Sequence, residues 1–178
     1  MRSIPLLLFS LFLAIGLQQP IIAQSSDPSY VSATLGVGLP DLVGVGVRLH
    51  DENFQLGVSG GTIPFAEDQY YTLTANAFFH LFGSAKHSTR KPWFTKLGFT
   101  YLHYETPDVK TIESYLGLSF GREFNFSKHF GVSFDLGALY LLSHESIDKT
   151  PSNNPFAFDL DLTFPVLPSA SLIFFYKF

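Results

Sequence analysis

Apolar and polar residues alternate with a period of two along most of this 178-residue chain. In the segment 130–140 every even position is apolar or aromatic, and positions 131, 133, 135 and 137 are Gly, Ser, Asp and Gly. This alternation predicts β-strands with one apolar and one polar face, because successive side chains of a strand point to opposite sides. The same pattern recurs in eight further segments: 30–38, 43–50, 53–59, 71–81, 93–101, 113–121, 156–164 and 169–178.

Nine candidate strands conflict with a single-chain bacterial barrel, which has an even number of strands. The segment 156–164 keeps the even-residue phase of the last segment, and Pro165 and Pro168 separate the two. We therefore interpret it as an extension of the last strand beyond the membrane, kinked by the prolines. A merger across Pro40 is the alternative. Either interpretation predicts an all-β, eight-stranded, antiparallel up-and-down transmembrane barrel, and ten strands are the next possibility.

The polar face indicates which side of the barrel looks outward. A soluble lipocalin-like barrel turns its apolar face inward, whereas a membrane barrel turns it toward lipid. The polar face here is built mainly of Gly, Ser, Thr and Asn with few charges, which suits a cramped lumen better than a water-facing surface. Ten of the 14 glycines lie on it: Gly36, Gly38, Gly44, Gly46, Gly57, Gly98, Gly117, Gly121, Gly131 and Gly137. A secreted lipocalin-like lipid binder remains as an alternative.

Composition agrees with a membrane location. Aromatic residues make up 16% of the chain, and charged residues make up 15%, which is well below the roughly 25% of soluble domains. The net charge of −4 provides no basic surface for nucleic acid. The absence of cysteine excludes disulfides, thiolate metal sites and a lipoprotein anchor.

The first residues have the pattern of a secretory signal. Arg2 precedes an apolar run over residues 4–17, which is shorter than the roughly 20 residues of a membrane-spanning helix. Small Ala23 offers a cleavage point, so we predict a signal peptide over residues 1–23 and a barrel domain over residues 24–178. An uncleaved anchor is the alternative interpretation.

Aromatic residues recur at the ends of the predicted strands. Ten steps from Phe130 to Tyr140, at ~3.3 Å each and a tilt of about 40°, cover roughly the 25 Å height of an outer-membrane apolar band. Girdles of aromatic residues flank that band in such barrels. We predict a periplasmic girdle of Phe79, Trp93, Phe130, Tyr176 and Phe178, and an outer girdle of Tyr71, Tyr101 and Tyr140.

The last strand, 169–178, ends on an aromatic residue and resembles the closing strand of bacterial outer-membrane barrels. Tyr176 and Phe178 fill the two aromatic places of that assembly signal, and Ser171 fills the upstream polar place, although Ile173 stands where Gly is usual. With these features the mature chain resembles the small OmpA/OmpX-type outer-membrane β-barrel proteins. The resemblance implies residence in the outer membrane of a bacterium, contact with its lipid and lipopolysaccharide, and insertion by the barrel-assembly machinery. It implies a structural or surface-interaction role rather than an enzymatic one.

Charged residues on the predicted inner face suggest an ion network. Arg48, Lys96, Asp135 and Lys177 point inward, with Glu113 nearer the outer mouth. Charges in so narrow a lumen need partners, because unpaired burial costs several kcal/mol per ion. We expect Asp135, at mid-height of its strand, to pair with Lys96 or Arg48 and to close the barrel to ions.

Candidate chemistry is sparse. No nucleotide-binding loop is present, and the six histidines lack metal-like spacing, so we predict no cofactor and no metal. His50 and His80 face inward near the periplasmic ends of their strands. We interpret them as ordinary lumen packing, and a shared ligand site is the lesser alternative. His144 and Ser146 have the His-x-Ser spacing of lipid A 3-O-deacylases, which resemble this chain in being small barrels. Asp159 or Asp161 would have to supply the orienting carboxylate, so the enzyme interpretation is the lesser alternative.

Overall fold

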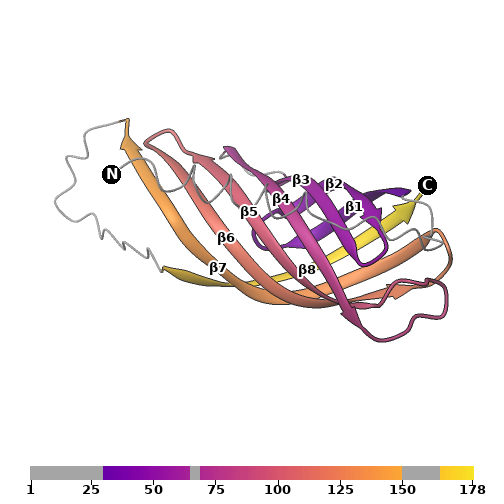
Figure 1. The fold of residues 1–178 in the computed structure, drawn as a ribbon. Coiled ribbons are helices and arrows are strands. Elements are labelled where there is room, and N and C mark those ends of the chain that lie inside the picture. Colours follow the sequence, from indigo (N-terminus) through magenta and orange to yellow (C-terminus); the bar gives the residue numbers. More distant parts are fainter. Residues whose placement is uncertain (1–29, 65–68, 150–164) are drawn as a thin grey trace.

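The computed structural model describes residues 30–64, 69–149 and 165–178. Consecutive strands pair antiparallel, and the last strand pairs with the first, so the sheet closes into a barrel (Figure 1). The eight-stranded antiparallel fold predicted from the alternation is therefore confirmed. The strands are β1 (Tyr30–Gly38), β2 (Leu42–Asp51), β3 (Phe54–Thr62), β4 (Gln69–Phe82), β5 (Trp93–Glu105), β6 (Val109–Asn125), β7 (Phe130–Asp148) and β8 (Val166–Lys177).

The structure corrects three details of the strand assignment. The chain does not run through Pro40 as one strand, because β1 and β2 are antiparallel partners joined by a turn at residues 39–41. Gly60 and Gly61, expected in a loop, belong to β3 and pair with β4. The polar residues 143–148, also expected in a loop, continue β7, because the long strand β6 offers them a partner. The segment 156–164 and the predicted signal peptide lie outside the described residues.

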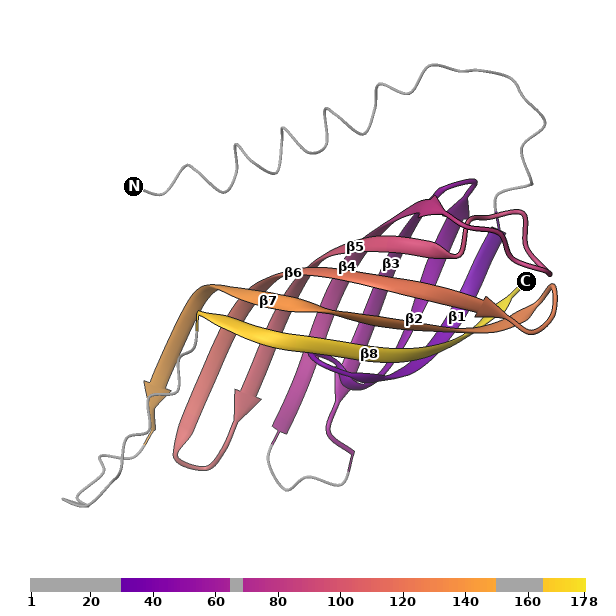
Figure 2. The ribbon, with the colours of Figure 1, turned by 90° about the horizontal axis from the view of Figure 1, so that it is seen from below.

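The barrel wall is much taller on one side than on the other. Strands β1 to β3 have nine or ten residues, whereas β5, β6 and β7 have 13, 17 and 19. The longer strands rise beyond the β1–β2 turn as a curved extension, away from the end where β8 reaches the C-terminus (Figure 2). We call the end near Lys177 the C-terminal end of the barrel, and the end with the extension the opposite end.

A bulge changes which β7 side chains face the inside of this extension. The β6–β7 register shifts between Ser114 and Tyr115, so that Ser114 pairs with Ser143 while Tyr115 pairs with Leu141. Leu142 is the extra residue, and side chains beyond it switch faces. The switch places His144 opposite Glu113.

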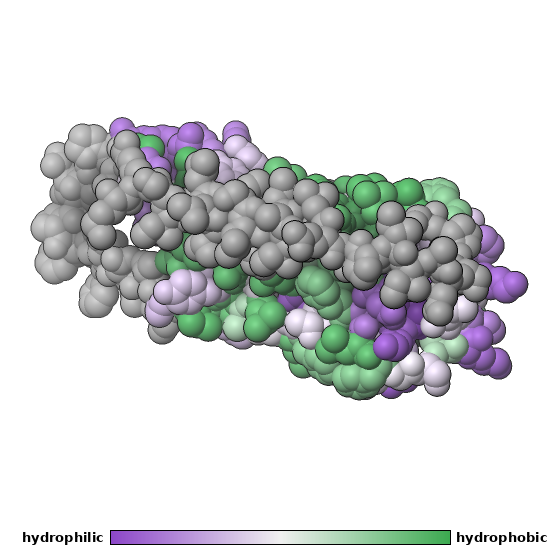
Figure 3. All heavy atoms as spheres, viewed as in Figure 1, coloured by the Kyte–Doolittle hydropathy of each residue, from purple (hydrophilic) through white to green (hydrophobic). Residues whose placement is uncertain are grey.

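The outer wall is apolar and exposed, and the lumen is largely polar and buried. The outward side chains of Val45 and Leu118 are 63% and 59% exposed, whereas Ser32 and Asp135 on the inner face are 0% and 1% exposed. On the face that Figure 3 shows, hydrophobic residues occupy much of the visible wall, and most hydrophilic residues lie toward the two ends. Contiguous exposed apolar surface of this kind marks contact with a membrane or a partner.

Two groups of large side chains interrupt the polar lumen. Phe78, Phe94 and Phe175 are fully buried toward the C-terminal end. Leu102, Tyr115 and Leu139 form an apolar cluster nearer the opposite end. In the part of the chain that the structure describes, no helix has the length and hydropathy of a membrane-spanning segment.

Candidate functional site: the charged lumen

Asp135 on β7 lies at the centre of the lumen. Lys96 of β5 donates to its Oδ1 at 2.6 Å, and Ser171 of β8 donates to its Oδ2 at 2.5 Å. The Asp135 side chain is 1% exposed and that of Lys96 is 14% exposed. Gly121 makes room for the carboxylate, because a Cβ there would lie 2.6 Å from the Cβ of Asp135. Of the two cations expected as partners for Asp135, the structure places Lys96 against it.

Arg48 instead lies nearest Glu123, which the sequence analysis did not identify. The distance from Arg48 Nη1 to Glu123 Oε1 is 3.8 Å, and the guanidinium lies over the ring of Phe78 at 4.4 Å. Glu123 also accepts two shorter contacts: Arg90 donates to Oε2 at 3.1 Å, and Gln55 donates to Oε1 at 2.9 Å. The expected network is therefore divided into a Lys96–Asp135 pair and a Glu123 cluster.

Two histidines pack against the Glu123 cluster. Arg90 donates to Nδ1 of His50 at 2.7 Å, so Nε2 of His50 carries the hydrogen and donates to Ser32 at 2.6 Å. Nδ1 of His80 donates to the carbonyl of Lys91 at 2.6 Å. Gln55 donates to Nε2 of His80 at 2.6 Å, so each ring nitrogen of His50 and His80 has a partner, which fits a role in lumen packing. Among the described residues, no group of three or more His, Cys, Asp or Glu is arranged to hold a metal ion.

Lys177 is separate from both groups. Its Nζ donates to Asn125 Oδ1 at 2.7 Å and lies over the rings of Tyr30 and Phe175 at 5.4 and 5.2 Å. It therefore caps the C-terminal end of the lumen through an amide and two aromatic rings. The sequence placed Lys177 correctly on the inner face but grouped it with residues that it does not contact.

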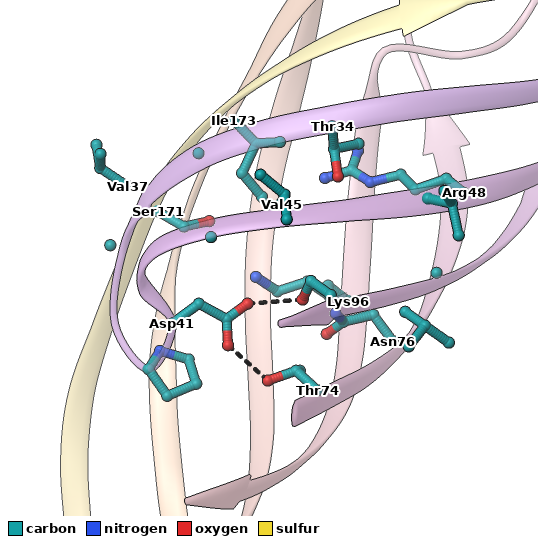
Figure 4. Close-up of a pocket in the computed structure, with 18 of the residues that line it drawn as sticks. Thr34, Val37, Asp41, Val45, Arg48, Thr74, Asn76, Lys96, Ser171 and Ile173 are labelled. Atoms are coloured by element: carbon teal, nitrogen blue, oxygen red, sulfur yellow. Dashed lines mark hydrogen bonds between the residues drawn. The ribbon is translucent and has the colours of Figure 1, made fainter. Parts of the chain in front are cut away.

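The β1–β2 turn folds into the lumen from the opposite end. Its Asp41 carboxylate accepts hydrogen bonds from Ser59, Thr72 and Thr74 at 2.6, 2.9 and 2.7 Å. Tyr70 donates to the carbonyl of Pro40 at 2.9 Å. These contacts hold the turn across the barrel, above a small cavity that Arg48 and Lys96 also line (Figure 4).

A second polar cluster lies on the extension, beyond the apolar band. Glu113 accepts hydrogen bonds from Nδ1 of His144 at 2.8 Å and from the hydroxyl of Tyr115. A carboxylate therefore lies beside His144, whereas Asp159 and Asp161, the two acids expected in that place, lie outside the described residues. Ser146 is exposed, and no hydrogen bond joins it to His144.

At the tip of the extension, Glu105 joins β5 to the end of β7. Lys149 donates to Glu105 at 2.6 Å, and His103 lies 3.0 Å away. These hydrogen bonds, that from Lys149 first, lower the pKa of Glu105 to about 2. The contact ties β5 to the segment that follows β7.

The predicted girdle residues lie on the outer face. Trp93 stacks on Phe120 at 5.3 Å, and Arg122 lies over Trp93 at 5.1 Å. Five other girdle residues are exposed by between 37% and 54%: Tyr71, Phe79, Tyr101, Phe130 and Tyr140. Their role as girdles stays a prediction.

The residues of the predicted assembly signal lie along β8. Tyr176 and Phe178 are exposed on the outer face, with ring centroids 5.4 Å apart. Ser171 faces inward, where it donates to Asp135. Ser171 therefore makes a contact inside the folded barrel, in addition to the role in assembly predicted for it.

Glu123, Arg90 and Asp41 are the lumen residues that the sequence analysis missed. Glu123 could have been found, because it continues the odd-residue phase of the segment 113–121. Arg90 lies in the connection between β4 and β5, and Asp41 lies in a turn. Period-two patterning carries no information about where such side chains point.

Comparisons with known proteins support the fold. No protein-family model matches this sequence, and no curated protein matches it. Among solved structures, CarO2 of Acinetobacter baumannii matches with a TM-score of 0.50 and 15% identity, covering 85% of this chain and 100% of that chain. CarO of Acinetobacter baumannii matches with a TM-score of 0.49 and 15% identity, covering 85% and 98%. At this identity, the likeness to CarO2 bears on the barrel architecture alone.

Proposed function

We propose that this protein is an integral outer-membrane β-barrel of a bacterium, with a closed lumen and a structural or surface-interaction role. The observation that carries the proposal is the inverted distribution of side chains. Aliphatic and aromatic residues are exposed around the wall, while Arg48, Glu123 and Asp135 are almost fully buried inside. A lipocalin-like lipid binder has the opposite arrangement, with an apolar cavity and a water-facing wall.

The lumen contacts support a barrel that does not conduct. Near the C-terminal end, the Glu123 cluster and the rings of Phe78, Phe94 and Phe175 fill the cross-section. Lys96 and Asp135 join β5 to β7 across the next level. Asp41 then holds the β1–β2 turn inside the opposite end. An eight-stranded barrel has an interior only just wide enough for such side chains.

Targeting and assembly complete the proposal. A cleaved signal over residues 1–23 would deliver the chain across the inner membrane. The barrel-assembly machinery would then recognise Ser171, Tyr176 and Phe178 in the last strand. Lipid and lipopolysaccharide of the outer membrane would surround the apolar wall. The tall β5–β7 extension, with its exposed charges, would be the part that meets partners outside the cell.

Membrane fractionation combined with a heat-shift gel tests this proposal. The protein should be recovered in the outer-membrane fraction, without residues 1–23, and should change its mobility on boiling in detergent. Recovery of a folded protein in the soluble periplasmic fraction would contradict it and would favour the lipocalin-like alternative.

A hydrolase of the lipid A deacylase type is the second candidate, because Glu113 holds His144 at 2.8 Å. A serine nucleophile must also lie within hydrogen-bond reach of its base, and Ser146 makes no such contact. We expect purified protein to release no hydroxy fatty acid from lipopolysaccharide. Release that is abolished by Ser146→Ala would establish the hydrolase instead.

A further inference from the structure

A small cavity with both polar and apolar lining lies in the lumen between the β1–β2 turn and the charged layer below it (Figure 4). Its volume is about 60 Å³, which is room for a few water molecules or a single small ion. Asp41 enters it from the turn, while the guanidinium of Arg48 lies beside Thr34 on the wall. Lys96 and Asn76 line it from β5 and β4.

Arg48 is the residue in this cavity whose contacts are incomplete. Its side chain is 4% exposed, and Nη1 is buried without a hydrogen-bond acceptor. The nearest carboxylate oxygen, Oε1 of Glu123, is 3.8 Å away, which is beyond hydrogen-bond distance. A buried guanidinium has five N–H donors and a full charge, and both require a partner.

The neighbouring carboxylates are already engaged with other donors. Glu123 accepts from Arg90 and Gln55. Asp135 accepts from Lys96 and Ser171. These donors orient both carboxylates, and in this arrangement neither accepts a hydrogen bond from Nη1 of Arg48.

A third carboxylate, that of Asp41, is held by three donors. It accepts hydrogen bonds from the hydroxyls of Ser59, Thr72 and Thr74. Its negative charge is therefore held at the turn side of the cavity, and an anion would be confined to the side lined by Arg48 and Lys96.

We propose that the cavity binds one small monovalent inorganic anion of the halide class, with Arg48 as its principal ligand. A halide only accepts hydrogen bonds, so it matches the unpaired Nη1 of Arg48. Lys96 adds a second positive charge, and the amide of Asn76 and the hydroxyl of Thr34 add neutral donors. Water also fits the space, but it carries no charge and so would not strengthen the loose pairing of Arg48 with Glu123 at 3.8 Å. The proposal requires the closed barrel and is independent of the cellular location.

The dependence of stability on chloride tests the proposal in purified, detergent-folded protein. Unfolding is followed by circular dichroism while chloride replaces gluconate, which is too large for the cavity, at constant ionic strength. At a chloride concentration ten times the dissociation constant, one site lowers the unfolding equilibrium constant roughly tenfold. Arg48→Met should remove this dependence. The matched control Arg122→Met should retain it, because Arg122 lies on the outer face over Trp93. Identical unfolding of the unmodified protein in both salts would overturn the proposal.

Bromide provides a direct measurement on the unmodified protein, which remains decisive if Arg48→Met fails to fold. Crystals grown in bromide should show an anomalous peak within hydrogen-bond distance of the Arg48 guanidinium. An ordered water at that position, with no anomalous signal, would show that the cavity is simply hydrated and would overturn the site.

Discussion

Replacing Asp135 by alanine removes the carboxylate that accepts hydrogen bonds from both Lys96 and Ser171. Breaking a buried ion pair by removing one partner destabilises proteins by about 3–5 kcal/mol, because the other charge is left without compensation. Lys96 is 14% exposed, so it can recover part of its hydration, and we expect about 3 kcal/mol, at the lower end of that range. The measurement is the free energy of unfolding by denaturant in lipid vesicles, followed by the fluorescence of Trp93, the single tryptophan of the chain.

Two further variants separate the ion pair from simple loss of packing. Ser171→Ala removes one hydrogen bond to the same carboxylate and should cost about 1.5–3 kcal/mol. The double variant Asp135→Ala/Lys96→Met removes both charges and should recover much of the loss, because no buried cation remains unpaired. The reasoning is refuted if Asp135→Ala costs less than about 1 kcal/mol, or if the double variant is less stable than Asp135→Ala alone.

Three other outcomes are expected. Phe178→Ser should lower the amount of protein assembled in the membrane more than it lowers the amount synthesised. Phe126→Ser, a matched change at another exposed aromatic residue, should not have this effect. Equal membrane levels for both variants would count against the assembly signal. The pKa of Glu105 is depressed to about 2, so its contact with Lys149 stabilises the protein fully above the ordinary carboxyl pKa of 4.5 and is lost as the pH falls toward 2. Carboxyl NMR should show a titration midpoint near 2 for Glu105, and Lys149→Met should raise that midpoint. Purified protein in planar bilayers should show no steady single-channel conductance, and reproducible channels would mean that the lumen packing is wrong.

The barrel could be predicted from the sequence because the alternation of side chains is a local property of each strand. Alternation follows from the geometry of a strand, and an even strand count follows from closure, so the phase of each segment assigned Asp135 and Lys96 to the lumen. Which inner residues meet depends on strand register, which alternation does not encode. For this reason, the sequence could not decide between Lys96 and Arg48 as the partner of Asp135.

The remaining features depend on departures from regular strands. The register shift between Ser114 and Tyr115 places Glu113 opposite His144. The alternation of residues around this shift does not predict the extra residue, Leu142. Arg90 and Asp41 enter the lumen from a connection and a turn, where the side-chain direction follows from tertiary contacts. Two of the charged lumen residues thus come from irregular segments, which is one reason why the barrel was easier to predict than the pairing of charges inside it.

A nitroxide scan along β7 in bilayer-reconstituted protein tests the central claim, that the apolar wall faces lipid, most directly. The chain has no cysteine, so single cysteines at positions 132, 133, 134 and 136 can be labelled without background, and Asp135 keeps its ion pair. Collision with oxygen, which concentrates in lipid, should be high at the outward positions 134 and 136 and low at the inward position 133. High collision with a water-soluble relaxation agent at positions 134 and 136 would contradict the account.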